Sequence, residues 1–373
     1  MGDSKIMTNN GMTWGILLAT ARPANLTEAE VFDHVLRYAL AAESYEYDTA
    51  WLMEHHFTDY AIAPDTLTMA GFLLGATSRL RIGTAVTVAP FIHPVRLAER
   101  VALLDHLGKG RFNLGLGRGI CKEDFSVFGV DPNDSHNLMY EAADIMLRAW
   151  KEDSIKNNGL FSFPETRVLP KPRSSELTVY AAAESASSVE WAANNGFPLL
   201  MQLITDYQEL AARLELYNSC AEAAGYDPNS IDHTIVCLGH ISESRERAKA
   251  EIFGFLEWWN DESSRIGFDD NDLKRLPGYR YHLNRIEQWV LEGKDTASFI
   301  DEWLDLNPVG SPEDCIRQLN KIVTVTGVRH VALGLEAAGN PNVTERNIRR
   351  FAQEVFPNVR QLTEERDGNE KTS

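Results

Sequence analysis

The sequence predicts an α/β fold, a (β/α)8 TIM barrel with inserted segments, and two observations support this prediction. Short β-rich runs alternate with longer segments of helical periodicity, which is the pattern of βα units and a parallel sheet. Eight such runs can be recognised. Eight strands, each followed by a helical pattern, fit a closed barrel better than an open sheet of about five or six strands.

The predicted elements follow one another along the whole chain. The eight expected strands span residues 13–19, 49–55, 80–88, 111–116, 178–183, 197–204, 234–240 and 330–335. Three helices have clear boundaries. The helix at 27–45 is introduced by NLTEAE, which places acids in its first turn, the helix at 95–107 follows Pro94, and the helix at 207–224 ends before Gly225.

A long connection at 242–328 separates the seventh and eighth expected strands. It contains two helical stretches, RERAKAEIFGFLEWWN and EDCIRQLNKIV, around a polar segment at 263–295. Long loops on the catalytic face of a barrel are commonly lids, so we expect this connection to bear one. The expected domain organisation is a flexible N-terminus at 1–12, a single barrel domain at 13–362 and a disordered tail at 363–373.

Composition and charge point to a cytoplasmic protein that binds a small molecule. The hydrophobic content of 44% and the charged content of 24% are those of an average soluble protein. A formal net charge of -18 repels nucleic acids and anionic membrane surfaces, so we expect neither as a partner. No signal peptide or membrane span is recognisable. The four cysteines are scattered without a CxxC pair, so they are interpreted as reduced thiols.

The stretch WLMEHHFTDY places Glu54, His55 and His56 at the end of the second expected strand, where barrel enzymes carry their chemistry. A metal site would need further ligands, from His93, His233 or His240, and EHH has no HExxH spacing. A structural role, with the rings bonded to backbone, is a second possibility. Acid–base or substrate-orienting use is favoured, because an imidazole titrates near neutrality and a carboxylate can fix its tautomer.

Two further segments could together hold a phosphate. RFNLGLGRG ends the fourth expected strand with glycines around Arg118, but it is not the dinucleotide fingerprint. AESASS, at 183–188, follows the fifth expected strand and begins a helix, where hydroxyls and free N–H groups bind anions. Each segment alone could be a bulged strand or a simple helix cap. Because the two strands are expected to be adjacent, a phosphate clamp is plausible.

Several motifs, in the same order, resemble the bacterial luciferase family of flavin monooxygenases, and in particular the luciferase α subunit. They are WLMEHHFTDY, LLGATSRLRIGTAVTVAPFIHPVRLAERVALLDHLGKGRF, GRGICKEDFSVFGVD, AAESASSVEWAANNGFP, LNPVGSPEDCI and GLEAAGN. The resemblance extends from about Trp14 to Phe356 and implies a (β/α)8 barrel with a mobile lid at 263–295.

The resemblance also implies the activity and the partners. Reduced FMN (FMNH2), supplied by an FMN reductase, would react with O2 to a flavin C4a-(hydro)peroxide that oxidises an aldehyde, a ketone or a natural-product intermediate such as a polyketide. The helix HPVRLAERVALLDHL implies a homodimer, and a heterodimer is possible. The alternatives are a long-chain aldehyde luciferase (alkanal monooxygenase), an F420-dependent oxidoreductase, a non-catalytic partner like the luciferase β subunit, and a metal-dependent barrel hydrolase.

Site residues are implied by position. His55 would be the catalytic histidine, with His56 and Asp124 beside it, and no metal is expected. The peptide between Ala85 and Val86 would be a cis bond under the flavin ring. The residues expected to bind or support the cofactor are Glu54, Ala85, Val86, Gly117, Arg118, Glu184, Ser185, Ala186, Ser187, Ser188, Trp259 and Glu336.

Two departures from the luciferase α subunit concern this pocket. Gly117 stands where that subunit has a reactive cysteine, and Cys121, four residues on, is not at the matching position. Leu203 replaces a tryptophan after the sixth expected strand. We therefore expect a pocket of different volume, without a thiol beside the flavin and without this aromatic wall. These departures place light emission in doubt and favour a tailoring oxygenase over a luciferase.

Overall fold

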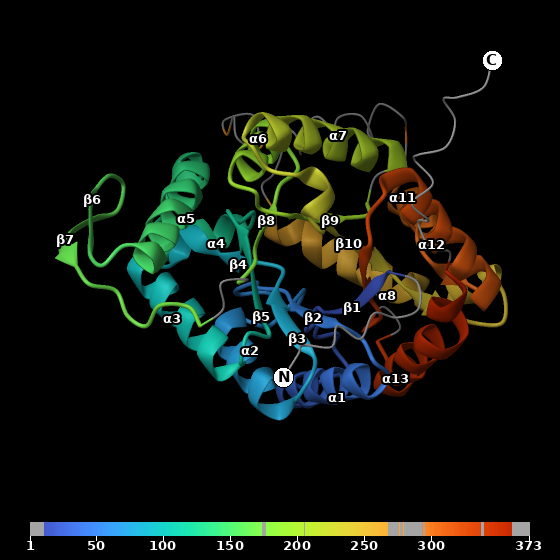
Figure 1. Cartoon of the computed structure of the whole chain (residues 1–373). Coiled ribbons are helices and arrows are strands. Elements are labelled where there is room, and N and C mark those ends of the chain that lie inside the picture. Colours follow the sequence, from blue (N-terminus) through green and yellow to red (C-terminus); the bar gives the residue numbers. More distant parts are fainter. Residues whose placement is uncertain are drawn as a thin grey trace, which may run out of the picture.

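A computed structural model describes residues 11–173, 177–204, 206–267, 276, 279, 293, 295–336 and 339–359. Eight parallel strands close into a barrel, and β3 pairs with β5 while β13 pairs with β1 (Figure 1). The barrel strands are β1 (Thr13–Leu18), β2 (Thr49–Leu52), β3 (Arg81–Thr84), β5 (Phe112–Gly117), β8 (Val179–Ala182), β9 (Leu199–Gln202), β10 (Thr234–Leu238) and β13 (His330–Gly334). The predicted fold class and all eight predicted strands are confirmed.

Most strand boundaries differ from the prediction by one or two residues, and two differences bear on the site. The second strand ends at Leu52, so residues 53–55 lie in a loop. The third expected strand is interrupted by a cis peptide between Ala85 and Val86, as the resemblance implied, and resumes as β4 (Thr87–Val88), which pairs with β5. Apolar composition alone could not locate these breaks, because apolar residues continue past each of them, with Met53 after the second strand and Ala85 and Val86 within the third.

Helices surround the barrel, as Figure 1 shows. They are α1 (Glu28–Ser44), α2 (Thr66–Ala76), α3 (Pro94–Leu107), α4 (Lys122–Phe128), α5 (Ser135–Lys151), α6 (Ala186–Asn194), α7 (Tyr207–Ala223), α12 (Pro312–Thr326) and α13 (Pro341–Arg350), with a π-helical turn at Phe351–Val355 and 3-10 turns at Ala89–Phe91, Pro132–Asp134, Pro228–Ser230 and Phe356–Asn358. The three predicted helices, α1, α3 and α7, are confirmed. Thr27 and Glu30 form a capping box that fixes the start of α1.

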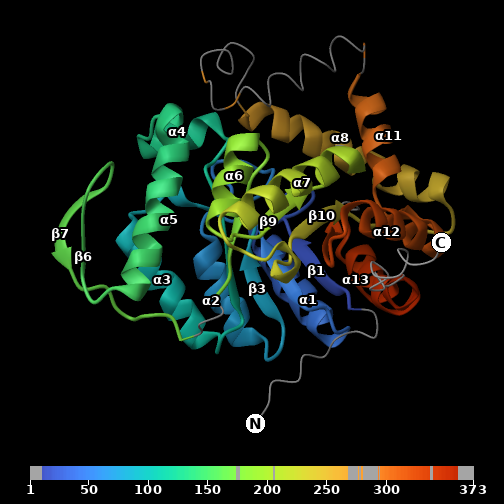
Figure 2. The same ribbon diagram turned by 45° about the horizontal axis from the view of Figure 1, so that its top comes forward.

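Two insertions extend the barrel. The antiparallel hairpin β6 (Ile155–Asn158) and β7 (Ser162–Thr166) stands away from it in both ribbon views (Figures 1 and 2). The long connection after β10 contains β11 (His240–Ile241), α8 (Arg245–Ile266), α11 (Thr296–Leu306) and β12 (Val309–Gly310) before α12. Both predicted helical stretches of this connection are confirmed, in α8 and α12. The hairpin and α11 were not predicted.

Much of the expected lid at 263–295 lies outside the described residues. Of that segment, residues 263–266 belong to α8, and Tyr279 is buried. The expected flexible N-terminus and tail also fall on residues that are mostly not described, although Met12 is only 1% exposed and packs in the core. Among the described helices, none has both the length and the apolarity that crossing a membrane requires.

The interior of the barrel is filled, so the binding space lies at one end. Trp51 is fully buried inside the barrel, and its ring meets Tyr180 edge to face at 5.0 Å. A side chain at Gly83 would come within 2.5 Å of the Trp51 ring, which explains the glycine there. Leu17, Leu200 and Ala332 complete this cluster. The open space is therefore at the carboxyl ends of the strands, the catalytic end of such barrels.

Candidate active site

A cavity of about 980 Å³ opens at the carboxyl ends of the barrel strands and is bordered by α8 and α11. Eleven of the fifteen predicted site residues line it, namely Glu54, His55, Ala85, Val86, Gly117, Arg118, Asp124, Glu184, Ser185, Ser188 and Trp259. Four do not. Ala186 and Ser187 are exposed, His56 lines a neighbouring groove, and Glu336 lines a smaller chamber.

His55 lies in the loop after β2 and faces the cavity. Its Nδ1 atom is 3.3 Å from the Cys121 Sγ atom, and its ring meets Tyr60 edge to face at 4.9 Å. Burial, together with a smaller effect of the neighbouring His56, lowers the pKa of His55 to about 4. The imidazole is therefore neutral near pH 7, with one nitrogen as donor and the other as acceptor.

Glu54 and His56 support this loop. The Glu54 carboxylate accepts hydrogen bonds from the Thr66 hydroxyl at 2.9 Å and from the Val88 N–H at 3.1 Å, so it connects the end of β2 to α2 and β4. The His56 Nε2 atom lies 3.7 Å from Glu54 Oε1, and the His56 ring packs against Phe128. These contacts fix the loop that carries His55.

The histidines considered as extra metal ligands do not converge on this site. His233 accepts a hydrogen bond from the Leu199 N–H, and His240 bonds to Glu251 and Asn347. No group of three or more His, Cys, Asp or Glu residues within the described part of the chain could hold a metal ion. The metal interpretation therefore has no support among these residues.

Arg118 provides a positive charge at one end of the cavity. Its guanidinium lies 3.5 Å from the centre of the Tyr279 ring, and its Nη1 atom is buried without a hydrogen-bond partner among the described residues. Burial lowers the pKa of Arg118, although an arginine remains protonated in proteins. A buried guanidinium N–H without a partner is costly, so it indicates a missing anionic ligand.

The start of α6 lies next to this arginine, because β5 and β8 are paired neighbours. Ser185 caps the helix by accepting from the Ser188 N–H at 3.4 Å, and the Ser188 hydroxyl donates to the Ser185 carbonyl at 2.8 Å. Both interpretations of this segment therefore hold: the serine is a cap, and it also lines the cavity. Together with Arg118, the residues present suit a phosphate group.

Gly117 and Val86 share one small space beside the cavity. A Cβ atom at residue 117 would lie 2.3 Å from the Val86 Cγ2 atom, which is an impossible approach. The valine therefore occupies the volume that a cysteine at 117 would need. This contact gives a physical reason for the first departure from the luciferase α subunit.

Residue 117 carries no thiol, but Cys121 places one at another point of the cavity wall. It precedes α4 and is 2% exposed, and burial together with Asp124 raises the pKa of its thiol. Asp124, in the first turn of α4, also lines the cavity. Burial raises the pKa of Asp124 to about 6, against the opposing effects of His56 and of the Cys121 thiol.

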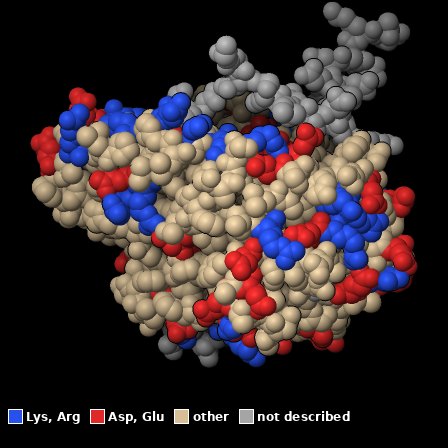
Figure 3. Space-filling model, turned by 90° about the horizontal axis from the view of Figure 1, so that it is seen from below, with Lys and Arg blue, Asp and Glu red and all other residues tan. Residues whose placement is uncertain are grey.

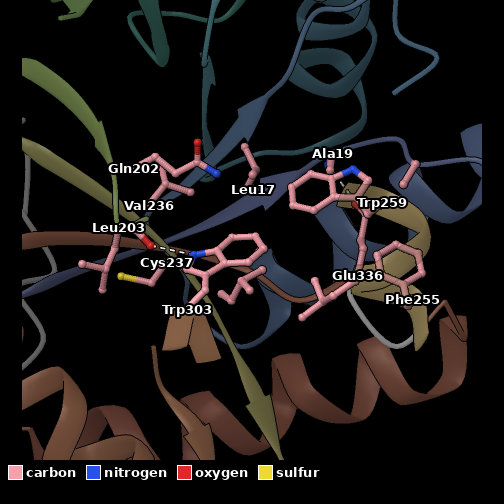
Figure 4. A pocket seen from close by; sticks show the side chains of 14 residues that line it. Leu17, Ala19, Gln202, Leu203, Val236, Cys237, Phe255, Trp259, Trp303 and Glu336 are labelled. Carbon is pink, nitrogen blue, oxygen red and sulfur yellow. Dashed lines mark hydrogen bonds between the residues drawn. The ribbon is translucent and has the colours of Figure 1, made fainter. Parts of the chain in front are cut away.

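An aromatic side chain from another element lies beside Leu203. The Trp303 Nε1–H of α11 donates to the Leu203 carbonyl at 2.8 Å, and its ring lies parallel to Trp259 at 6.0 Å. Trp259 in turn stacks on Tyr60 at 4.7 Å. Figure 4 shows Trp303 beside Leu203, and Trp259 on the other side of the pocket near Ala19. A tryptophan from α11 therefore supplies the wall that residue 203 lacks.

Behind these tryptophans lies a small apolar chamber of about 30 Å³ (Figure 4). Glu336 lines it and accepts a hydrogen bond from the Ala19 N–H at 3.0 Å. Burial raises the pKa of Glu336 to about 7, although backbone N–H groups of residues 19–21 oppose the shift. The expected role of Glu336 as a supporting residue is consistent with this position outside the main cavity.

Sequence reasoning missed several residues of the site, among them Cys121, His136, Tyr279 and Trp303. Cys121 was set aside because it does not match a family position, although its place just after the fourth strand was a usable signal. Tyr279 and Trp303 belong to the long connection, far from the strand ends along the chain. His136, a further cavity residue, had no motif around it.

Comparison with known proteins gives consistent results. The sequence profile of the family described as luciferase-like monooxygenase matches residues 12–330. The alkanal monooxygenase alpha chain of a Kryptophanaron alfredi symbiont is 35% identical over 353 residues, covering 94% of this chain and 99% of that one. The corresponding alpha chain of Photorhabdus luminescens is 36% identical over 351 residues, covering 93% of this chain and 97% of that one.

Solved structures show the same fold at lower identity. A monooxygenase from Streptomyces bottropensis superposes with a TM-score of 0.78 at 23% identity, covering 93% of this chain and 99% of that one. The oxygenating constituent of 3,6-diketocamphane monooxygenase from Pseudomonas putida, a type II Baeyer-Villiger enzyme in complex with FMN, gives 0.73 at 18% identity, covering 94% and 99%. At these identities the likeness concerns the fold alone.

Proposed function

This chain belongs to the luciferase-like monooxygenase family, and we propose that it is the oxygenating component of a two-component enzyme that uses reduced FMN and O2. The observation that carries this proposal is Arg118, whose buried Nη1 atom has no hydrogen-bond partner and which lies beside the capped start of α6. An FMN phosphate would satisfy this nitrogen. A cofactor without a phosphate would leave it unpaired.

Reduced FMN, when bound, supplies the electrons that activate O2, and the residues of this chain would bind and shield it. Arg118, Ser185 and Ser188 would hold the phosphate, and remote binding energy of this kind positions the reacting part of a ligand. Tyr60, Trp259 and the barrel wall limit the access of water to the inner cavity. Neutral His55 would accept or donate a proton at the reacting atoms.

The proposed partners follow from the same assignment. A separate FMN reductase would supply the reduced flavin, and the protein would work in the cytoplasm. The exposed apolar residues Phe72 on α2 and Leu103 and Leu107 on α3 form a surface suited to a homodimer. A heterodimer remains the alternative, because the relatives named alkanal monooxygenase include alpha and beta chains.

The organic substrate has two candidate classes. The names of the relatives, with 35% identity over most of the chain, favour a long-chain aldehyde. The altered wall, with Leu203 and Trp303 in place of the family tryptophan, instead favours a bulkier natural-product intermediate such as a polyketide. We prefer the second class, because a relocated aromatic ring changes the shape of the pocket. An F420-dependent activity is named for structural neighbours of 19% and 17% identity, for which the likeness concerns the fold alone.

Aerobic incubation with FMN, NADH and a generic flavin reductase, with and without decanal, tests this proposal. Fatty acid without light would indicate a dark aldehyde oxygenase, and fatty acid with light a luciferase. Hydrogen peroxide alone would indicate an enzyme that needs another substrate. Failure of the isolated protein to bind reduced FMN would contradict the proposal and favour a non-catalytic partner subunit.

A further inference from the structure

Cys121 contacts the Nδ1 atom of the His55 ring, and both residues line the cavity. Within the described part of the chain, the Cys121 sulfur, 3.3 Å from Nδ1, is the hydrogen-bond partner of the His55 ring. The same thiol lies beside the carboxyl of Asp124, three residues later on α4, which raises the pKa of the thiol. Three titratable groups therefore lie side by side, in the order Asp124–Cys121–His55.

The number of available protons fixes the direction of the hydrogen bonds among these groups. Burial and Asp124 keep the thiol protonated, and burial keeps His55 neutral, so each carries a single proton. An ionised Asp124 can only accept, so it takes the S–H. The sulfur must then accept the Nδ1–H of His55. In this state the Nε2 atom has a free lone pair and can act as a base.

Protonation of Asp124 reverses this direction. The carboxyl O–H then donates to sulfur, the S–H donates to Nδ1, and the hydrogen of the imidazole lies on Nε2. A proton accepted at Nε2 can reach the same state by relay: the Nδ1–H bond breaks as a new S–H bond forms, and the former S–H proton moves to the Asp124 carboxylate. No buried imidazolium remains, which matters because burial disfavours that cation.

We propose that Cys121 is a positioning residue that sets the tautomer of His55, and that Asp124 selects between a basic Nε2 and an Nε2–H. This proposal rests on the proposed function in one respect, namely that His55 transfers a proton at the reacting atoms. The charged groups that face Asp124 are His56, which favours its ionised form, and Glu54 and Glu123, which oppose it. His56 also faces His55, so it is retained in every variant.

The test is the tautomer of His55, read from the ring-nitrogen shifts of histidine-labelled protein without flavin or substrate. His55→Gln assigns the signal. At pH 8, wild-type protein should contain roughly five times more of the Nδ1–H tautomer than of the Nε2–H tautomer. At pH 5 the ratio should be reversed, with roughly a fivefold excess of the Nε2–H tautomer. Asp124→Asn should abolish this change. Cys121→Ala and Cys121→Val should give one tautomer ratio at both pH values, whereas Cys121→Ser should retain the change.

An unchanged pH response in Cys121→Ala or Cys121→Val would overturn the proposal, as would a wild-type ratio that is the same at pH 5 and pH 8. Two non-bonding variants are used so that poor folding of one does not decide the result, and Asp124→Asn gives an independent outcome. Because this measurement needs no turnover, it can succeed even if the protein fails to oxidise any substrate. In that case the proposed function alone would be contradicted.

Discussion

At the scale of single residues, the site depends on buried ionisable side chains, and the residues around each side chain explain its protonation and its hydrogen bonding. Arg118 is buried against Tyr279 with one N–H unpaired, and His55 is held neutral by its surroundings. The motifs around these two residues could be found from the sequence, because each follows a strand and carries an unusual residue type. Of their partners, Cys121 had a signal in its place just after the fourth strand, whereas Tyr279 reaches Arg118 only through the fold.

Arg118→Ala should weaken FMN binding by roughly 10- to 100-fold, because a charge-assisted hydrogen bond contributes about 1.5–3 kcal/mol. Riboflavin, which has no phosphate, should bind the variant and the wild type almost equally. Fluorescence titration with both ligands measures this difference. The exposed Arg96→Ala is the matched control. Equal losses for FMN and riboflavin would show that Arg118 does not recognise the phosphate.

Glu336 should make stability depend on pH. Its pKa is about 7 in the folded protein and 4.5 in the unfolded chain. The stability that its neutral carboxyl contributes to the fold is therefore complete below pH 4.5 and is lost as the pH rises to 7. Between pH 4.5 and 8, wild type should lose up to ~3 kcal/mol relative to Glu336→Gln. Urea unfolding at several pH values measures this, with exposed Glu190→Gln as control. A constant difference between wild type and Glu336→Gln would contradict the assignment.

At the scale of elements, the sequence predicted what periodicity and helix caps encode. The eight strands and the starts of α1 and α3 have such signals, in Thr27, Glu30 and Pro94. The β6–β7 hairpin has no such signal, since its residues are largely exposed and polar. The helix α11 is placed by tertiary contacts, because Trp303 packs beside Leu203 and Trp259 from a distant part of the chain.

The contact between β5 and the break after β3 can be tested with a double-mutant cycle. Gly117→Cys alone should cost about 1–3 kcal/mol of stability, because its Cβ atom would overlap the Val86 side chain. Combined with Val86→Ala, the same cysteine should fit. Denaturant unfolding of the two single variants and the double variant should show a favourable coupling of about 1–3 kcal/mol.

Gly75→Cys is the control for that cycle, because a side chain at this position would meet no atom within 4 Å. It should change stability by less than 0.5 kcal/mol or so, as surface substitutions usually do within about that range. Additive effects of Gly117→Cys and Val86→Ala would show that the two residues do not compete for one space.

At the scale of the whole molecule, charge is distributed without a dominant patch on the face seen in Figure 3, where acidic and basic residues are interspersed. The apolar surface is more specific. Phe72, Leu103 and Leu107 are 59%, 48% and 63% exposed on the adjacent helices α2 and α3. Exposed apolar groups of this kind commonly mark an interface.

Phe72→Glu combined with Leu103→Glu should convert a wild-type dimer to monomers, because two carboxylates would be buried without partners in the interface. Light scattering after size exclusion measures the mass. Leu160→Glu, at an equally exposed leucine on the hairpin turn, should leave the dimer intact. A dimer that persists in the double variant would place the interface elsewhere.

The central claim is that this cavity holds reduced FMN and controls its reaction with O2. The most direct test mixes the anaerobic complex of protein and reduced FMN with oxygenated buffer in a stopped-flow instrument and follows flavin absorbance. The account predicts at least two phases, a reaction with O2 followed by a slower return of oxidised flavin, and the loss of this behaviour in Arg118→Ala. A single phase identical to that of free reduced FMN would contradict it.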